Sequence, residues 1–263
     1  MSGLLLRLAG PLQSWGERSA FTPVRDTAPF PTRSALVGLF AAAEGIGRSD
    51  SGRDGGIDRY DGLRITVRVD RPGVRLIDYH TVGGGQPKAR TAATSGGSNK
   101  GAAVITRRHY LSDAVFVVAV SGEDDTISRL ADALHRPHWA PYLGRRSCVP
   151  DEPFVLRSHI DDPENELLTA VPLSRPAPAH RDGGTDDTVP VEFLHERLPA
   201  DAASLSADTF DVSDLPVSFA PHGRSYGVRR LYRSVEWLPA TLTGPQSQLL
   251  RRLIDYAQTE ECA

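Results

Sequence analysis

The segment YLGRRSC at residues 142–148 contains the residue types best suited to binding a polyanion. Its two arginines carry planar guanidinium groups that suit successive phosphates, and its serine adds a hydroxyl. Its glycine allows a backbone to approach a ligand closely, and its tyrosine could stack on a base. A solvated turn with exposed arginines remains the alternative. The candidate binding residues of this segment are Tyr142, Gly144, Arg145, Arg146 and Ser147.

A second basic element is the segment 83–103, GGGQPKARTAATSGGSNKGAA, which lies between two stretches with strand character. It is poor in apolar residues and rich in Gly, Ser and Thr, so it predicts a long hairpin with a mobile tip. A connection of this length in a compact domain is usually functional, and a disordered loop is the simpler alternative. The basic candidates in and beside the segment are Lys88, Lys100, Arg107 and Arg108.

The segment FPTRSALVGL at residues 30–39 predicts a helix that begins close to Arg33 and packs against a sheet. A helix N-terminus presents free backbone N–H groups, so Arg33 and these groups could together hold a phosphate. The alternative is an ordinary structural loop beside a buried Trp15, with no ligand.

The pairs Tyr79-His80 and His109-Tyr110 flank the insert and could face each other across its base. A metal-free ribonuclease needs a base for the 2′-OH, an acid for the leaving 5′-oxygen and a cation for the phosphorane, which His, Tyr and Lys can supply. We favour cross-strand aromatic packing over this set. The other histidines and the two cysteines show no metal-ligand spacing, and nucleotide-loop and hydrolase motifs are missing, so we expect no metal and no cofactor.

The composition of the 263 residues is that of a soluble globular protein, with 40% hydrophobic and 24% charged residues. The net charge of −3 hides an asymmetry, because residues 1–150 carry +6 and residues 151–263 carry −9. A basic first half indicates a polyanion-binding half beside an acidic half with another task. The first residues predict a buried strand rather than a signal peptide, and no apolar run reaches the length of a membrane span. We therefore expect a cytoplasmic protein with no membrane contact.

The elements read along the chain predict an α+β protein. Strand, helix, strand, hairpin insert, strand, helix and strand follow one another over residues 1–160, which is the split βαβ order of a ferredoxin-like fold. Within it, residues 62–69 alternate like a half-buried strand with Arg64, Thr66 and Arg68 on the solvent face. Residues 161–188 predict a linker, and residues 189–263 predict a small, mainly β C-terminal domain that ends in a helix.

Several segments together resemble the Cas-five family of CRISPR-associated proteins in the form found in the type I-E Cascade complex. The residues that carry the resemblance cover roughly 3–160, and the stretch 217–237 is similar to the end of the family pattern. The matching segments are LLLRLAGPLQSWG, FPTRSALVGL, DYHTV, RRHYLSDAVFVVAV and PYLGRRSCVP.

The resemblance implies a modified ferredoxin-like domain, of the RRM-like RAMP type, with a β-hairpin thumb at about residues 79–111. It implies a non-catalytic subunit for antiviral defence that binds the 5′ handle of crRNA through the loop Tyr142–Ser147 and with Arg33 at a helix start. The implied partners are the adjacent backbone subunit CasC, the large subunit CasA and, through the complex, target DNA. Some other subtypes of the family cleave the repeat themselves, so a repeat endoribonuclease that processes pre-crRNA stays the alternative.

Overall fold

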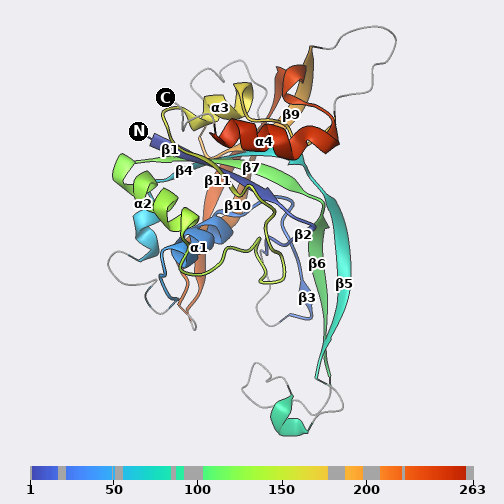
Figure 1. Cartoon of the computed structure of the whole chain (residues 1–263). Coiled ribbons are helices and arrows are strands. Elements are labelled where there is room, and N and C mark those ends of the chain that lie inside the picture. The colour runs from blue at the N-terminus through green and yellow to red at the C-terminus, as the bar shows by residue number, and fades with distance from the viewer. Residues whose placement is uncertain are drawn as a thin grey trace.

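The computed structural model describes residues 2–16, 22–48, 50, 56–83, 87–91, 103–176, 187–197, 208–220 and 223–258. A seven-stranded sheet with antiparallel neighbours forms its centre, in the order β10-β11-β9-β4-β7-β1-β8 (Figure 1). Its strands are β1 (Ser2–Ala9), β4 (Arg64–Arg71), β7 (Val115–Gly122), β8 (Val155–Ile160), β9 (Thr188–His195), β10 (Asp208–Ser218) and β11 (Ser225–Pro239).

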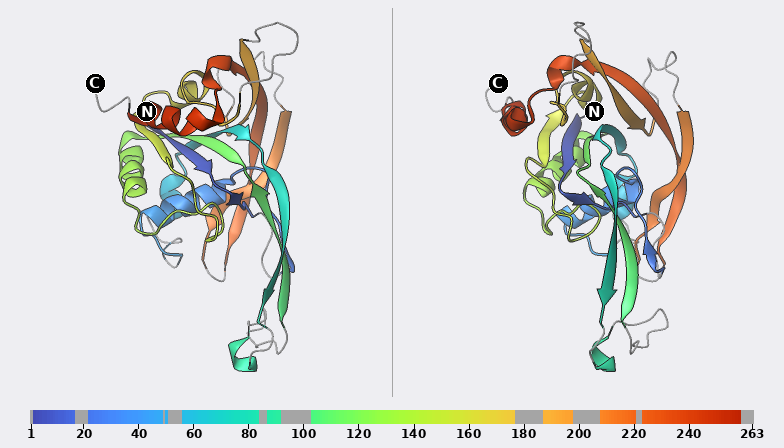
Figure 2. Two further views of the ribbon diagram at one scale, coloured as in Figure 1. Left: turned by 45° about the vertical axis from the view of Figure 1, so that its right-hand side comes forward. Right: turned by 90° about the vertical axis from the view of Figure 1, so that its right-hand side faces the viewer.

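The four strands β8-β1-β7-β4 come from the first part of the chain. Helix α1 (Arg33–Ala43) lies in the connection from β1 to β4, and α2 (Asp124–His135) connects β7 to β8. Strands β9, β11 and β10 continue this sheet beyond β4, so the strands of residues 188–239 share one sheet with those of the first part. Figure 2 shows β10 and β11 as a long, strongly curved pair at the side of the protein.

Both faces of the sheet are covered, which explains why β1 and β7 are apolar at almost every position. Leu4, Leu6 and Leu8 of β1 pack into a core with α1 and α2, whereas Leu5 points to a second core on the opposite face. That second core includes α3 (Pro163–Thr169) and α4 (Leu249–Gln258), which lie above the sheet in Figure 1. No described helix is long and apolar enough to cross a membrane.

The second core overturns the prediction that β4 is half buried. Thr66 and Arg68, predicted on the solvent face, are 3% and 0% exposed. The guanidinium of Arg68 donates to the carboxylate of Asp70 and to three backbone carbonyls, including that of Leu167 in α3. Helix α3 lies within the stretch predicted as a linker, and its packing, together with that of residues 171–174, removes this face of β4 from solvent.

A two-stranded hairpin leaves the sheet where β4 ends, and it extends well beyond the rest of the protein in Figures 1 and 2. It consists of β5 (Val74–Val82) and β6 (Val104–Ser112), paired from Val74↔Ser112 to Val82↔Val104. The short strands β2 (Leu12–Gln13) and β3 (Val24–Arg25) pair with β6. Single 3-10 turns are η1 (Ile57–Tyr60), η2 (Lys88–Arg90), η4 (Ala240–Leu242) and η5 (Gln246–Gln248).

Candidate nucleic-acid interface

The loop 142–148 is anchored by two buried residues and presents its polar residues outward. Leu143 and Cys148 are 0% and 1% exposed, and the N–H of Leu143 donates to the carbonyl of Cys148 at 2.7 Å. The N–H of Cys148 in turn donates to the carbonyl of Arg145 at 2.8 Å. Between these anchors, Arg146 and Ser147 are exposed. The loop is therefore a rigid turn that holds two polar side chains in solvent.

Gly144 is explained by packing within the protein. Its φ of +85° lies in the left-handed region, and a Cβ at this position would lie 1.7 Å from the carbonyl oxygen of Ser14. The adjacent carbonyl of Leu143 accepts a hydrogen bond from the N–H of Ser14 at 3.1 Å. The close backbone approach that this glycine permits is thus to the segment after β1, and a ligand is not needed to account for it.

Arg145 connects this loop to the base of the hairpin. Its Cζ atom lies 4.6 Å from the ring centroid of Tyr110 in β6, which is a cation–π contact. Its Nη2 donates to the carbonyl of Arg25 at 3.1 Å, whereas its Nη1 is buried without a partner among the described residues. The alternative of a solvated turn with exposed arginines therefore does not describe Arg145, whose Nη1 is a strong donor without a partner among the described residues.

Three further arginines lie at the same base. Strand β3 runs parallel to β6 and places Arg25 beside Arg108, and Val24 beside Arg107. Arg107 is exposed and Arg108 is half-buried, with its Nε donating to Thr106 Oγ1 at 3.3 Å. Arg108 and Tyr110 are two residues apart in β6 and share a face, so Arg108 lies on the side of the loop 142–148, whereas Arg107 points to the other side of the strand. Arg25 was not predicted from the sequence, because the two-residue strand that positions it has no periodicity to recognise.

The hairpin carries exposed apolar side chains along its length, such as Ile77 at 57% and Tyr79 at 63%. Lys88 is exposed in η2, toward the far end of the hairpin. Lys100 lies outside the described residues, as does most of the predicted mobile tip.

Arg33 is placed away from this surface. It is 5% exposed, and its Nη1 contacts both carboxylate oxygens of Glu196 at 2.7 Å and donates to the carbonyl of Leu63. Its backbone N–H donates to Asp214 Oδ2 at 2.7 Å, and Arg229 bridges Asp214 and Glu196. The donors expected to hold a phosphate are instead used to join α1 to β10 and β11, because acidic residues far along the chain reach the helix start.

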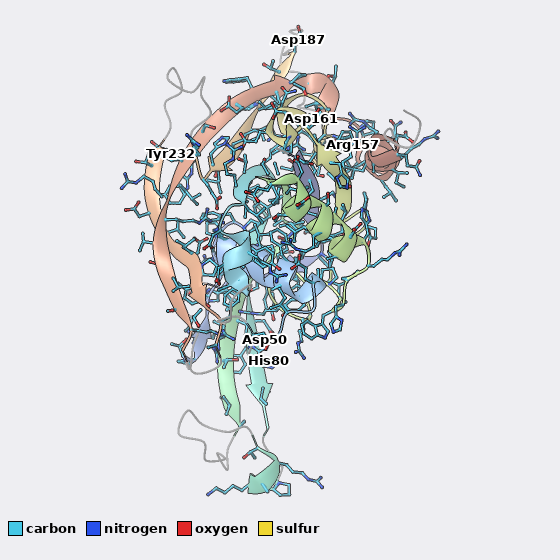
Figure 3. The ribbon with its side chains drawn as sticks, turned by 90° about the vertical axis from the view of Figure 1, so that its left-hand side faces the viewer. Asp50, His80, Arg157, Asp161, Asp187 and Tyr232 are labelled. Atoms are coloured by element: carbon cyan, nitrogen blue, oxygen red, sulfur yellow. The ribbon has the colours of Figure 1, made fainter. Side chains whose placement is uncertain are left out.

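The two histidines of the suggested ribonuclease set do not face each other. In the register of the hairpin, His109 is opposite Ile77 and His80 is opposite Thr106. Because side chains alternate along a strand, His80 and His109 point to opposite faces. His80, labelled on the hairpin in Figure 3, has Asp78 Oδ2 at 3.8 Å from its Nδ1. The two histidines therefore do not pair with each other, whereas Tyr79, opposite Arg107, shares its face of the hairpin with His109.

The aromatic residues near the loop divide into exposed and buried ones. Trp139 is 46% exposed and contacts His138 edge to face, with the ring centroids 4.6 Å apart. Tyr142 is half-buried, and Trp15 is fully buried, with its Nε1 donating to Gln13 Oε1. Burial raises the pKa of the Cys148 thiol, which keeps it protonated and unreactive at neutral pH. Among the described residues, no group of three or more His, Cys, Asp or Glu side chains could hold a metal ion.

Comparison with known proteins gives concordant results. The family model described as "CRISPR-associated protein (Cas_Cas5)" matches residues 3–232. The chain is 38% identical over 184 residues to "CRISPR system Cascade subunit CasD" of Escherichia coli K12, a match that covers 65% of this chain and 78% of that protein.

Solved structures also match. A chain of a "CRISPR RNA-guided surveillance complex" is 45% identical with a TM-score of 0.84, over 98% of this chain and 100% of that chain. A second, "Crystal structure of Cas protein", is 30% identical with a TM-score of 0.56, over 92% and 97%. The mixed α+β architecture, mostly β with few helices, is thus that of solved Cas proteins. The chain belongs to the Cas5 family of CRISPR-associated proteins.

Proposed function

We propose that this chain is a non-catalytic, RNA-binding subunit of a type I-E CRISPR surveillance complex and holds the 5′ handle of crRNA. Its kinship with a Cascade subunit and with a chain of a surveillance complex supports the role in CRISPR defence. The observation that carries RNA binding is the convergence of Arg25, Arg108 and Arg145 at the base of the hairpin, where Arg145 lies over Tyr110 on the same face of β6 as Arg108.

This convergence suits a short single strand of RNA. Arginine side chains supply phosphate contacts whose strength falls with salt, and a rigid turn at residues 142–148 fixes their spacing. Bases splayed from the strand can stack on exposed rings such as Trp139. Guide pairing reads the target DNA, so the protein needs to recognise only the constant handle.

The fold is the proposed scaffold for this role. The order β8-β1-β7-β4 with α1 and α2 in the two crossover connections is what a ferredoxin-like RAMP domain requires, and we assign the β5–β6 hairpin as its thumb. The exposed apolar residues of the hairpin would contact the adjacent backbone subunit, CasC, once RNA is bound. The large subunit, CasA, would dock alongside, and target DNA would be reached only through the complex.

Binding of handle RNA by the purified protein tests the proposal. Handle RNA and a scrambled RNA of equal length are titrated at several salt concentrations, and we expect tighter binding of the handle with affinity that falls as salt rises. Equal binding of both RNAs, or none, contradicts the proposal.

The ribonuclease alternative is tested with repeat RNA in the absence of metal. Cleavage at one position that is lost in His80→Ala or His109→Ala would establish a repeat endoribonuclease. We expect intact RNA, because the two histidines lie on opposite faces of the hairpin.

A further inference from the structure

Buried polar atoms without hydrogen-bond partners occur in two groups among the described residues. In the described part of the chain there are six such side-chain atoms. Two of them, Arg145 Nη1 and His109 Nδ1, belong to the interface described above. Three others, on Arg7, Arg71 and Ser174, gather around the carboxylate of Asp70 on the other face of the sheet. A buried donor without a hydrogen bond lowers the stability of the folded state, so a second group of such donors needs an explanation, and a bound ligand would provide one.

Asp70 does not satisfy these donors, because its oxygens are already used. Its Oδ1 accepts from Arg68 Nε at 2.7 Å, and its Oδ2 accepts from Arg68 Nη2 at 3.2 Å and from the backbone N–H of Ser174 at 2.7 Å. The charge of Asp70 is therefore neutralised by Arg68 within the protein. The exposed Asp151 acts on the charge of Arg7, but the Nε atoms of Arg7 and Arg71 have no hydrogen-bond partner among the described residues.

Arg7 is the most constrained member of the cluster. It is 7% exposed, yet no described residue accepts a hydrogen bond from its Nε. Asp70, Arg71 and the exposed Asp151 lie close enough to act on its charge. Burial lowers the pKa of the Arg7 guanidinium, although the negative charges of Asp151 and Asp70 partly oppose this shift.

A bulge in β4 brings Arg71 to this cluster. Val69 pairs with Phe116 and Arg71 with Val115, so Asp70 and Arg71 together occupy one position against β7. Without the extra residue, strand alternation would direct Arg71 away from the side of Asp70. The half-buried Arg175, whose Nη2 donates to the carbonyl of Pro190, adds a third positive charge near Asp70.

Arg71 relates this cluster to the hairpin. It lies three residues before the first residue of β5, at the root of the hairpin whose base carries the candidate RNA surface. This position makes RNA the first ligand to test at the cluster.

We propose that Arg7 and Arg71 form an anion site that binds one backbone phosphate of the RNA, on the face of the sheet opposite the loop 142–148. Two guanidinium groups are donors that suit phosphate oxygens, whereas the fully buried Ser174 takes no direct part. The RNA assignment rests on the proposed function, whereas the existence of an anion site does not.

Thermal unfolding of the isolated protein tests the anion site, with inorganic phosphate as the probe and chloride at equal ionic strength as the reference. We expect phosphate at about ten times its Kd to raise the Tm by about 3 °C. Arg71→Gln should abolish this rise, and Arg251→Gln on α4, an exposed arginine that pairs with Asp255, should keep it. No phosphate-dependent rise in the unmodified protein overturns the site.

Arg7→Met separates a binding role from a structural one. If Arg7 binds the anion, this variant loses the phosphate-dependent rise in Tm. If Arg7 is merely an unpaired buried charge, its replacement raises the Tm equally in chloride and in phosphate. The second result overturns the proposal.

Handle RNA then identifies the ligand. Arg71→Gln should weaken binding about tenfold and reduce the slope of log affinity against log salt by about 0.7, the value for one phosphate of a single strand. If the phosphate effect is lost but RNA affinity and slope equal those of Arg251→Gln, the RNA assignment is wrong and an acidic segment of a partner protein is the ligand. If the unmodified protein binds phosphate but no RNA, the proposed function fails while the anion site stands.

Discussion

The guanidinium of Arg145 lies over the ring of Tyr110, with Cζ 4.6 Å from the ring centroid. This contact joins the loop 142–148 to the strand that forms one side of the hairpin. Arg145 and Arg146 are adjacent arginines, but this contact gives them different surroundings. Arg145 is part of the packed structure, and Arg146 is exposed.

Single alanine substitutions should separate these two arginines. Arg145→Ala removes the cation–π contact and the hydrogen bond to the carbonyl of Arg25, so we expect the free energy of unfolding to fall by about 1–2 kcal/mol. Arg146→Ala should leave it within about 0.5 kcal/mol. Both should weaken RNA binding, measured by titration. Equal losses of stability in urea unfolding would contradict the distinction.

Gly144 offers a test of the loop geometry. An alanine Cβ would lie 1.7 Å from the carbonyl oxygen of Ser14, and φ is +85°. Gly144→Ala should therefore reduce the free energy of unfolding by about 2 kcal/mol or more, with part of the loss from the left-handed backbone. Gly62→Ala is the matched control, because nothing lies within 4 Å of its added Cβ. Similar stability of both variants in urea unfolding would show that the loop can move away from Ser14.

The ion network at the start of α1 predicts a structural role for Arg33. Arg33→Met leaves the carboxylate of Glu196 buried with one of its two guanidinium partners missing, so we expect a loss of about 3 kcal/mol in the free energy of unfolding. The salt dependence of RNA binding should not change in the folded variant. Arg146→Met is the control. For this variant we expect little change in the free energy of unfolding and a smaller salt dependence of RNA binding. A smaller slope of log RNA affinity against log salt for Arg33→Met would show that Arg33 contacts the RNA after all.

The comparison of these arginines shows how far the sequence can predict this protein. Apolar periodicity predicts β1, α1 and α2 because their burial pattern is local. It misses the roles of Arg33 and Arg68, because their partners, Glu196 and the carbonyls of residues 167–172, come from more than 95 positions away. Candidate loops such as 142–148 can be recognised from composition. The positions of Arg25 and Arg71 cannot, because a two-residue strand places Arg25 and a bulge places Arg71.

The buried His195 should make stability depend on pH. Its Nε2 is bonded to Ser234 Oγ, and burial lowers its pKa below the ordinary value of 6.5, although Glu164 and Glu236 partly oppose this. In the unfolded chain His195 binds a proton near pH 6.5, whereas in the folded state it does so only at lower pH. Stability is therefore full above pH 6.5 and falls as pH decreases, by up to about 1.4 kcal/mol per pH unit.

His195→Gln is the control for this pH effect, because glutamine does not titrate. Urea unfolding at pH 7.5 and pH 5.0 should show a larger loss of stability in the unmodified protein than in the variant. An identical pH dependence of both proteins would assign the effect to other groups.

The register of the hairpin allows its outer part to be removed without disturbing the rest. Val82 pairs with Val104, so replacing residues 84–102 by Gly-Asn-Gly leaves a short connection between two strands that remain paired. Most of the replaced residues lie outside those described here; among the described ones, Lys88 and Arg90 in η2 are exposed. The free energy of unfolding of the isolated chain should therefore remain unchanged within about 0.5 kcal/mol.

Incorporation into the RNA-containing complex, measured by co-purification with its other subunits, should decrease, because the removed segment carries basic residues suited to the RNA. Unfolding of the shortened chain would show that the segment belongs to the core, and undiminished incorporation would show that the hairpin tip has no part in assembly.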